Sequence, residues 1–140
     1  MINAFTRIVT TGLCIVAGYI CLQTLYVKYK LKSIHFQFDS LSSQTPQKCI
    51  VFVSDPQACY WCLKQAELWN EQTQKFIDNK GYTLLKLNVS DGILLARKLK
   101  LNHFSGFPVT LFFDINSVEA QRIYGVFNMK KLIKTVNQIK

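Results

Sequence analysis

A run of twenty uncharged residues, Ile8 to Val27, constrains this chain more than any other feature. As an α-helix it would span about 30 Å, which is the thickness of the hydrocarbon core of a bilayer. A cleaved secretory signal usually has a shorter apolar core that ends at small residues, and no clean site of that kind follows the run. We therefore predict a single-pass membrane anchor over residues 1–32 and one soluble domain over residues 33–140.

Positive charge dominates the chain, which carries a net charge of +9. Three lysines (Lys28, Lys30 and Lys32) follow the apolar run, whereas Arg7 and the terminal amine precede it. This excess of one charge favours the cytoplasm for the soluble domain. No recognition motif for nucleic acid accompanies the lysines near the C-terminus, so we predict a solvated face and no nucleic-acid partner.

The soluble part alternates between apolar runs typical of strands and amphipathic patterns typical of helices. The expected strands cover residues 33–38, 49–53, 82–89, 109–113 and 120–124, and the expected helices cover 59–79, 93–99 and 128–139. Leu63, Ala66, Trp69 and Phe76 lie on the expected buried stripe of the longest helix. Strands separated by helices need parallel crossovers, so the pattern predicts an α/β layer with one antiparallel edge.

One motif carries chemistry, the Cys59-Tyr60-Trp61-Cys62 sequence directly after an apolar strand and at the start of a helix. The free N–H groups and the dipole of a helix N-terminus favour a thiolate at the first cysteine. A spacing of three brings the second sulfur within bonding reach. We predict Cys59 as the exposed nucleophile and Cys62 as the buried resolving thiol, with no cofactor beyond the redox-active Cys59–Cys62 disulfide.

Two other interpretations of the cysteine pair stay open. Two thiolates can be half of a zinc site, but the chain has no second Cys-x-x-Cys, and His35 and His103 lack the regular ligand spacing. We therefore predict no metal ligand. The pair can also be purely structural. Cys49, which alternates with apolar neighbours in a strand, is expected to be an inert core thiol.

The order strand, Cys-x-x-Cys, helix, strand, helix, and then Gly-Phe-Pro-Val-Thr-Leu-Phe-Phe-Asp over residues 106–114, resembles the thioredoxin superfamily. In particular it is similar to the thioredoxin-like domains of bacterial membrane disulfide reductases and related envelope thioredoxins. The resemblance covers about two thirds of the chain, from about Cys49 onward. It implies a thioredoxin-like fold, a central mixed sheet flanked by helices, next to the N-terminal transmembrane helix.

The resemblance also implies roles for residues outside the cysteine pair. Pro108 takes the position of a cis-proline that faces the active-site disulfide. Phe107 takes the position whose backbone hydrogen-bonds an extended substrate. With Tyr60 and Trp61, these two residues make up the predicted substrate-binding surface.

The departures from the thioredoxin pattern concern the environment of the sulfurs. Ala58 replaces a tryptophan, and Tyr60-Trp61 replace Gly-Pro, a pair that tunes the redox potential. Val53 occupies the position of a buried acid six residues before Cys59, so proton transfer to and from Cys62 needs another group or water. Glu67 is a candidate by its nearness in sequence alone, and a solvated helix glutamate is the favoured interpretation.

We therefore predict a membrane-tethered thiol-disulfide oxidoreductase that acts on protein dithiols and disulfides, with a membrane electron donor as a further partner. The resemblance favours the periplasm for the soluble domain, against the lysine count. Two alternatives use the same fold. One is a non-enzymatic adaptor in an envelope complex, and the other is a metal-binding or metal-delivery module that uses the two thiolates of Cys59 and Cys62.

Overall fold

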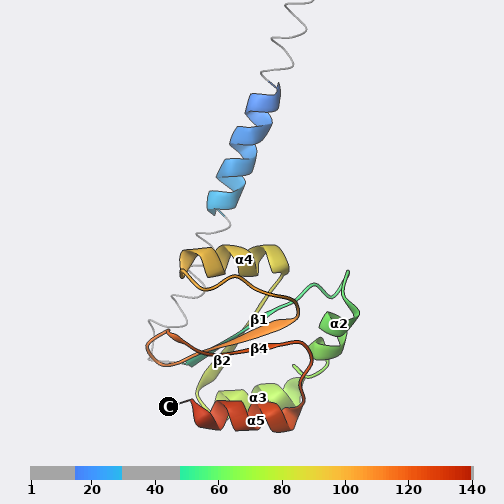
Figure 1. Ribbon diagram of the computed structural model, residues 1–140, viewed down its shortest axis with the longest axis vertical. Helices are drawn as coiled ribbons and strands as arrows, with labels where there is room; N and C mark the ends of the chain where they lie inside the picture. Colours follow the sequence, from blue (N-terminus) through green and yellow to red (C-terminus); the bar gives the residue numbers. More distant parts are fainter. Residues whose placement is uncertain (1–14, 30–47, 140) are drawn as a thin grey trace, which may run out of the picture. The chain divides into compact units, whose positions relative to one another are not determined.

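A computed structural model describes residues 15–29 and 48–139 (Figure 1). The chain divides into two compact units, Met1–Ser33 and Ile34–Lys140. The described part of the first unit is a helix over residues 15–29. In the two described ranges, no helix combines the length and the apolar character needed to cross a membrane. Residues 8–14 of the predicted anchor and the predicted strand over residues 33–38 lie outside the described residues.

In the described part of the second unit, a four-stranded mixed sheet with the order β2-β1-β3-β4 forms the centre. β1 (Lys48–Val53) is parallel to β2 (Tyr82–Leu87) and antiparallel to β3 (Val109–Phe113). β3 is also antiparallel to β4 (Glu119–Tyr124), as predicted for that edge. The mixed sheet confirms the predicted α/β layer with a central mixed sheet, but the expectation that β3 runs parallel to β1 is wrong.

The connection from α4 (Val89–Lys98) to β3 explains this reversal. α4 begins where β2 ends, and β3 begins at the same edge of the sheet, because Val53 at the end of β1 pairs with both Leu87 and Val109. A helix that starts at this edge carries the chain away from it. Residues 99–108 form an irregular segment that returns the chain, so β3 enters the sheet opposite in direction to β1.

The two faces of the sheet carry separate hydrophobic clusters, as expected for a central strand buried on both sides. Successive residues of a strand point to opposite faces. Cys49, Val51 and Val53 of β1 belong to the cluster under α4, whereas Ile50 and Phe52 belong to the other. Figure 1 shows α4 on one side of the sheet and the helices over residues 71–79 and 129–138 on the opposite side.

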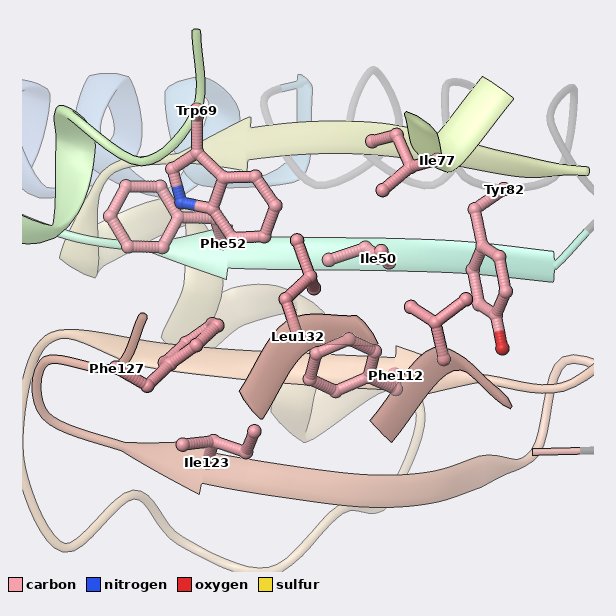
Figure 2. Packing of buried hydrophobic residues seen from close by; sticks show 10 residues of the cluster. Ile50, Phe52, Trp69, Ile77, Tyr82, Phe112, Ile123, Phe127 and Leu132 are labelled. Carbon is pink, nitrogen blue, oxygen red and sulfur yellow. The ribbon is translucent and has the colours of Figure 1, made fainter. Parts of the chain in front are cut away.

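The second face is covered by α3 (Glu71–Asn79) and α5 (Met129–Gln138), which lie side by side (Figure 1). Figure 2 shows the packing between them and the sheet, with Leu132 of α5 pointing toward Ile50 of β1. Trp69 lies against Phe52, with ring centroids 5.6 Å apart.

Two helices, α2 (Tyr60–Ala66) and α3, replace the single helix predicted over residues 59–79. The chain turns before Asn70, whose side-chain oxygen accepts a hydrogen bond from the Thr73 N–H at 3.0 Å and so begins α3 as an N-cap. Because of this break, α2 buries Cys62 and Gln65. The prediction that Leu63 is buried is therefore wrong, since its side chain is 53% exposed.

Asparagine caps also set the starts of α4 and α5. The Asn88 side chain accepts from the Asp91 N–H at 2.8 Å, so α4 begins at Val89 and not near Ile93 as predicted. Asn128 caps α5 in the same way, one residue from the predicted start of the helix. In each case the cap satisfies an N–H group that has no partner within the helix.

Candidate functional site

The Cys59 sulfur forms the N-cap of α2. Cys59 has an extended backbone, and its sulfur accepts a hydrogen bond from the Cys62 N–H at 3.2 Å. The backbone oxygen of the same residue accepts from the Leu63 N–H at 3.1 Å. A cysteine thus takes the place that serine, threonine or aspartate fills in most helices, and the cap holds its sulfur over the first turn.

The two sulfurs differ in acidity. A hydrogen bond from the Cys62 thiol lowers the pKa of Cys59 below its ordinary value; burial opposes this, and the N–H groups of Cys62 and Trp61 add to the lowering. Burial, followed by that same hydrogen bond, raises the pKa of Cys62 to about 11. Cys59 is half-buried, whereas Cys62 is fully enclosed. The geometry therefore favours a thiolate at Cys59 and a retained proton at Cys62.

Asp55, in the loop between β1 and α2, acts on both sulfurs. Its backbone N–H donates a hydrogen bond to the Cys62 sulfur. Beyond the dominant effects of hydrogen bonding at Cys59 and burial at Cys62, the negative charge of Asp55 raises both pKa values. Glu67, the candidate suggested by sequence, is exposed and lies 3.7 Å from the Lys64 ammonium. The sequence pattern does not indicate this role of Asp55, although the residue precedes Cys59 by only four positions.

Pro108 lies at the same edge of the sheet as the cysteine loop. The Phe107–Pro108 peptide bond is cis, and the Pro108 oxygen accepts from the Gly125 N–H at 2.8 Å. Val109 follows immediately and pairs with Val53, the last strand residue before the loop to Cys59. Because the two strands are antiparallel, the first residue of β3 therefore lies beside the last residue of β1.

The three aromatic residues predicted for substrate binding lie on α2 and on the segment before β3. Tyr60 and Trp61 open α2 with 62% and 60% of their surface exposed, and their rings meet edge to face with centroids 5.2 Å apart. Phe107 lies on the segment before β3, half-buried, and packs against the cluster under α4. Large exposed aromatic groups that lie together are typical of a surface that contacts a partner.

Gln65 connects α2 to the segment between β4 and α5. Its side chain is fully buried, and its oxygen accepts from the Phe127 N–H at 2.7 Å, between β4 and α5. The amide nitrogen has no hydrogen-bond partner among the described residues. Gln65 was not among the predicted site residues, although a position three after Cys62 lies on the same helix face.

The described cysteines, Cys21, Cys49, Cys59 and Cys62, are all free thiols. Cys49 is buried in β1 as expected, and burial raises its pKa to about 12. Across residues 15–29 and 48–139, no three or more histidine, cysteine or acidic side chains gather as a metal site would require. A metal-binding site at the cysteine pair would thus have only the Cys59 and Cys62 thiolates as ligands among the described residues.

Solved structures of thioredoxins are similar to this chain in fold. The thioredoxin NaTrxh of Nicotiana alata is 17% identical, with a TM-score of 0.58 over 76% of this chain and 84% of that one. A thioredoxin of Fasciola hepatica is 21% identical, with a TM-score of 0.56 over 74% and 91% of the two chains. One of Malassezia sympodialis is 16% identical, with a TM-score of 0.56 over 73% and 82%.

No protein-family model matches the chain, and no curated protein matches it in sequence. At these identities the structural likeness establishes the fold. The second unit therefore has a thioredoxin-like α/β fold.

Proposed function

We propose that this protein is a thiol-disulfide oxidoreductase that exchanges disulfides with protein partners through Cys59 and Cys62. The observation that carries the proposal is the unequal state of the two sulfurs at the start of α2. Cys59 is half-buried and accepts hydrogen bonds that lower its pKa, whereas Cys62 is fully buried and burial raises its pKa to about 11. A nucleophile beside a buried resolving thiol is what disulfide exchange requires.

In the proposed reaction, the Cys59 thiolate attacks one sulfur of a partner's disulfide and forms a mixed disulfide. The partner's other sulfur leaves as a thiolate and takes up a proton. Cys62 then loses its proton and attacks the Cys59 sulfur, which releases the second partner thiol and forms the Cys59–Cys62 disulfide. Two electrons pass to the partner, and the reverse sequence oxidises a partner dithiol.

The predicted substrate surface remains part of this proposal. Tyr60 and Trp61 would contact apolar side chains of the partner next to Cys59. Phe107 and Pro108 would receive the partner's backbone at the entry to β3. Support comes from the exposure of the two α2 aromatic residues and from the register that sets β1 and β3 side by side.

Turnover of a protein disulfide such as insulin, with dithiothreitol as reductant, tests the function on the 140-residue chain. Cys59→Ser should lower the rate by on the order of a hundredfold or more, because the nucleophile is lost. Cys62→Ser should accumulate a mixed disulfide at Cys59. Cys21→Ser removes an exposed cysteine elsewhere and should keep the wild-type rate. A Cys59→Ser, Cys62→Ser double variant with wild-type turnover would refute the proposal and favour an adaptor.

Membrane attachment through residues 1–32, with the thioredoxin-like domain in the periplasm, is the second part of the proposal. It is supported by the twenty uncharged residues from Ile8 to Val27. In a bacterial host, the chain should stay with the membrane fraction in alkaline carbonate and be released by detergent. A reporter fused after Lys140 should be active outside the cytoplasm. Carbonate release, or activity of a cytoplasmic reporter alone, would contradict this part.

A further inference from the structure

An enclosed ion pair on β4 depends on an irregularity in the strand. Nε and Nη2 of Arg122 donate to the two carboxylate oxygens of Glu119, each at 2.6 Å, and the two side chains are 12% and 18% exposed. Residues three apart in a regular strand point to opposite faces. A register shift between Phe112 and Phe113 leaves Ala120 as an extra residue, and such a bulge turns Glu119 toward the Arg122 side.

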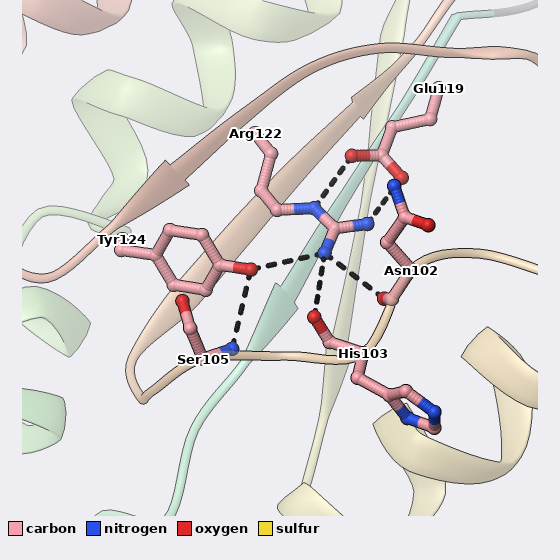
Figure 3. A network of polar contacts seen from close by, with 6 residues as sticks. All are labelled: Asn102, His103, Ser105, Glu119, Arg122 and Tyr124. Atoms are coloured by element: carbon pink, nitrogen blue, oxygen red, sulfur yellow. Dashed lines mark hydrogen bonds and ion pairs between the residues drawn. The ribbon is translucent and has the colours of Figure 1, made fainter.

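The third guanidinium nitrogen of Arg122 faces away from Glu119, toward the segment that leads to β3 (Figure 3). Nη1 donates to the backbone oxygens of Asn102 at 3.1 Å and His103 at 3.4 Å, and to the Tyr124 hydroxyl at 3.0 Å. One side chain thus joins β4 to two consecutive carbonyls, and its pKa is raised mainly by the Glu119 hydrogen bonds, so it stays charged.

Residues 102–107 need such a support because they lack regular structure. Among the described residues, none of residues 102–107 forms a backbone–backbone hydrogen bond. The Ser105 N–H donates to the Tyr124 hydroxyl at 3.4 Å, which ties the segment to β4 a second time. Polar side chains of β4 therefore hydrogen-bond three backbone groups of this segment, the Asn102 and His103 oxygens and the Ser105 N–H.

An aromatic path leads from Arg122 to the residue before Pro108. The guanidinium lies 5.4 Å from the centroid of the Phe104 ring, and Phe104 meets Phe107 edge to face with centroids 5.8 Å apart. Cation–π and edge-to-face contacts each favour a defined orientation. The position of Phe107 is thus coupled to Arg122 through one intervening side chain.

We infer that Arg122 is a positioning residue that holds residues 102–107 so that Phe107 presents its backbone to an incoming protein disulfide. This inference rests on the proposed function. Arg122 touches neither sulfur in any contact of the described residues, so its effect is on partner binding and not on the exchange at Cys59. A lysine keeps the charge but has a single nitrogen, which cannot hold Glu119 and the loop carbonyls together.

The test compares two substrates of the 140-residue chain, insulin and a small aromatic disulfide that has no peptide backbone. In Arg122→Lys and Arg122→Gln, KM for insulin should rise by on the order of tenfold, because misplacement of a positioning group weakens productive binding. The rate with the small disulfide should change by less than about twofold. Lys75→Gln, which removes a cation from an exposed pair with Glu71, is the matched control and should leave both rates unchanged.

A wild-type KM for insulin in Arg122→Lys, or an equal loss with both substrates, would overturn the inference, since charge or general stability would then explain the residue. Amide hydrogen exchange at Ser105 tests, without turnover, whether Arg122 holds residues 102–107 in place. It should be faster by on the order of tenfold in Arg122→Lys, and unchanged exchange would overturn the inference. Wild-type protein that turns over neither substrate would instead refute the proposed function.

Discussion

Gly92 of α4 lies directly over Val53 of β1, so close that a methyl group at Gly92 would overlap both branches of the Val53 side chain. Val53 is the last strand residue before the cysteine loop, and it fills the position where the thioredoxin resemblance leads one to expect a buried acid. The absence of a side chain at Gly92 thus lets α4 approach the strand that positions Cys59.

Gly92→Ala should destabilise the protein by about 1–2 kcal/mol. Overpacking against a stiff, β-branched neighbour costs about 1–3 kcal/mol, and the better helix propensity of alanine offsets up to about 1 kcal/mol of this. Urea unfolding measures the change. Val53→Ala in the Gly92→Ala background should restore part of the loss by making room. A Gly92→Ala variant as stable as wild type would show that the contact is not tight.

Asp55→Asn should lower the pKa of Cys59. Hydrogen bonding from Cys62 dominates that pKa, but the carboxylate of Asp55 raises it, and asparagine removes the negative charge while keeping an acceptor for the Gln57 N–H. The pH dependence of alkylation by iodoacetamide measures the shift, which should bring faster reaction below the wild-type pKa. Glu67→Gln removes an exposed carboxylate near the end of α2 and is the control. An unchanged or raised pKa in Asp55→Asn would contradict the assignment.

Tyr82→Phe should make stability less sensitive to alkaline pH. Burial raises the pKa of Tyr82 to about 12, with a further contribution from Asp114. The folded protein holds this proton more tightly than the unfolded chain does. The Tyr82 hydroxyl therefore adds to the free energy of unfolding below about pH 10, and this addition is lost as pH rises toward about 12.

Urea unfolding at about pH 8 and about pH 11 should show a loss smaller by roughly 1 kcal/mol in Tyr82→Phe than in wild type. Near neutral pH the variant should lie within about 1 kcal/mol of wild type, since the buried hydroxyl has no hydrogen-bond partner among the described residues. Equal losses in both proteins at high pH would show that Tyr82 does not titrate in this window.

Gln65→Leu should destabilise the protein by about 1–3 kcal/mol. The change removes the acceptor of the Phe127 N–H and leaves a buried donor unpaired. Gln72→Leu, on the exposed side of α3, is the matched control and should stay within about 0.5 kcal/mol of wild type. A Gln65→Leu variant as stable as this control would mean that water or another acceptor satisfies Phe127.

The sequence pattern predicted the elements whose periodicity is long or fully apolar. The run over residues 109–113 became β3, its antiparallel neighbour became β4, and the Cys-x-x-Cys motif opens a helix after a buried strand. The break between α2 and α3 was missed, because an apolar stripe at helical spacing continued through Trp69. The Asn70 cap and the burial of Trp69 against Phe52 outweigh that periodicity.

From the residue pattern alone, the site could be predicted only where its residues are close in sequence, and the place of Pro108 came from the thioredoxin resemblance. The contact between Cys59 and Cys62 follows from their spacing in one helical turn. The contacts of Arg122 with Asn102 and His103 join residues about twenty positions apart and depend on the path of an irregular segment. The ion pair with Glu119 also needs the bulge at Ala120, which no hydrophobic pattern signals.

A redox titration of the 140-residue chain against glutathione, with alkylation and mass spectrometry of the peptides, tests the account most directly. We expect one reversible two-electron transition that converts the Cys59 and Cys62 thiols into a single disulfide, with a midpoint between about −270 and −120 mV. Within the dithiol form, Cys59 should be alkylated first. If both thiols persist under the most oxidising buffer, or if either pairs with a different cysteine, the exchange mechanism is contradicted.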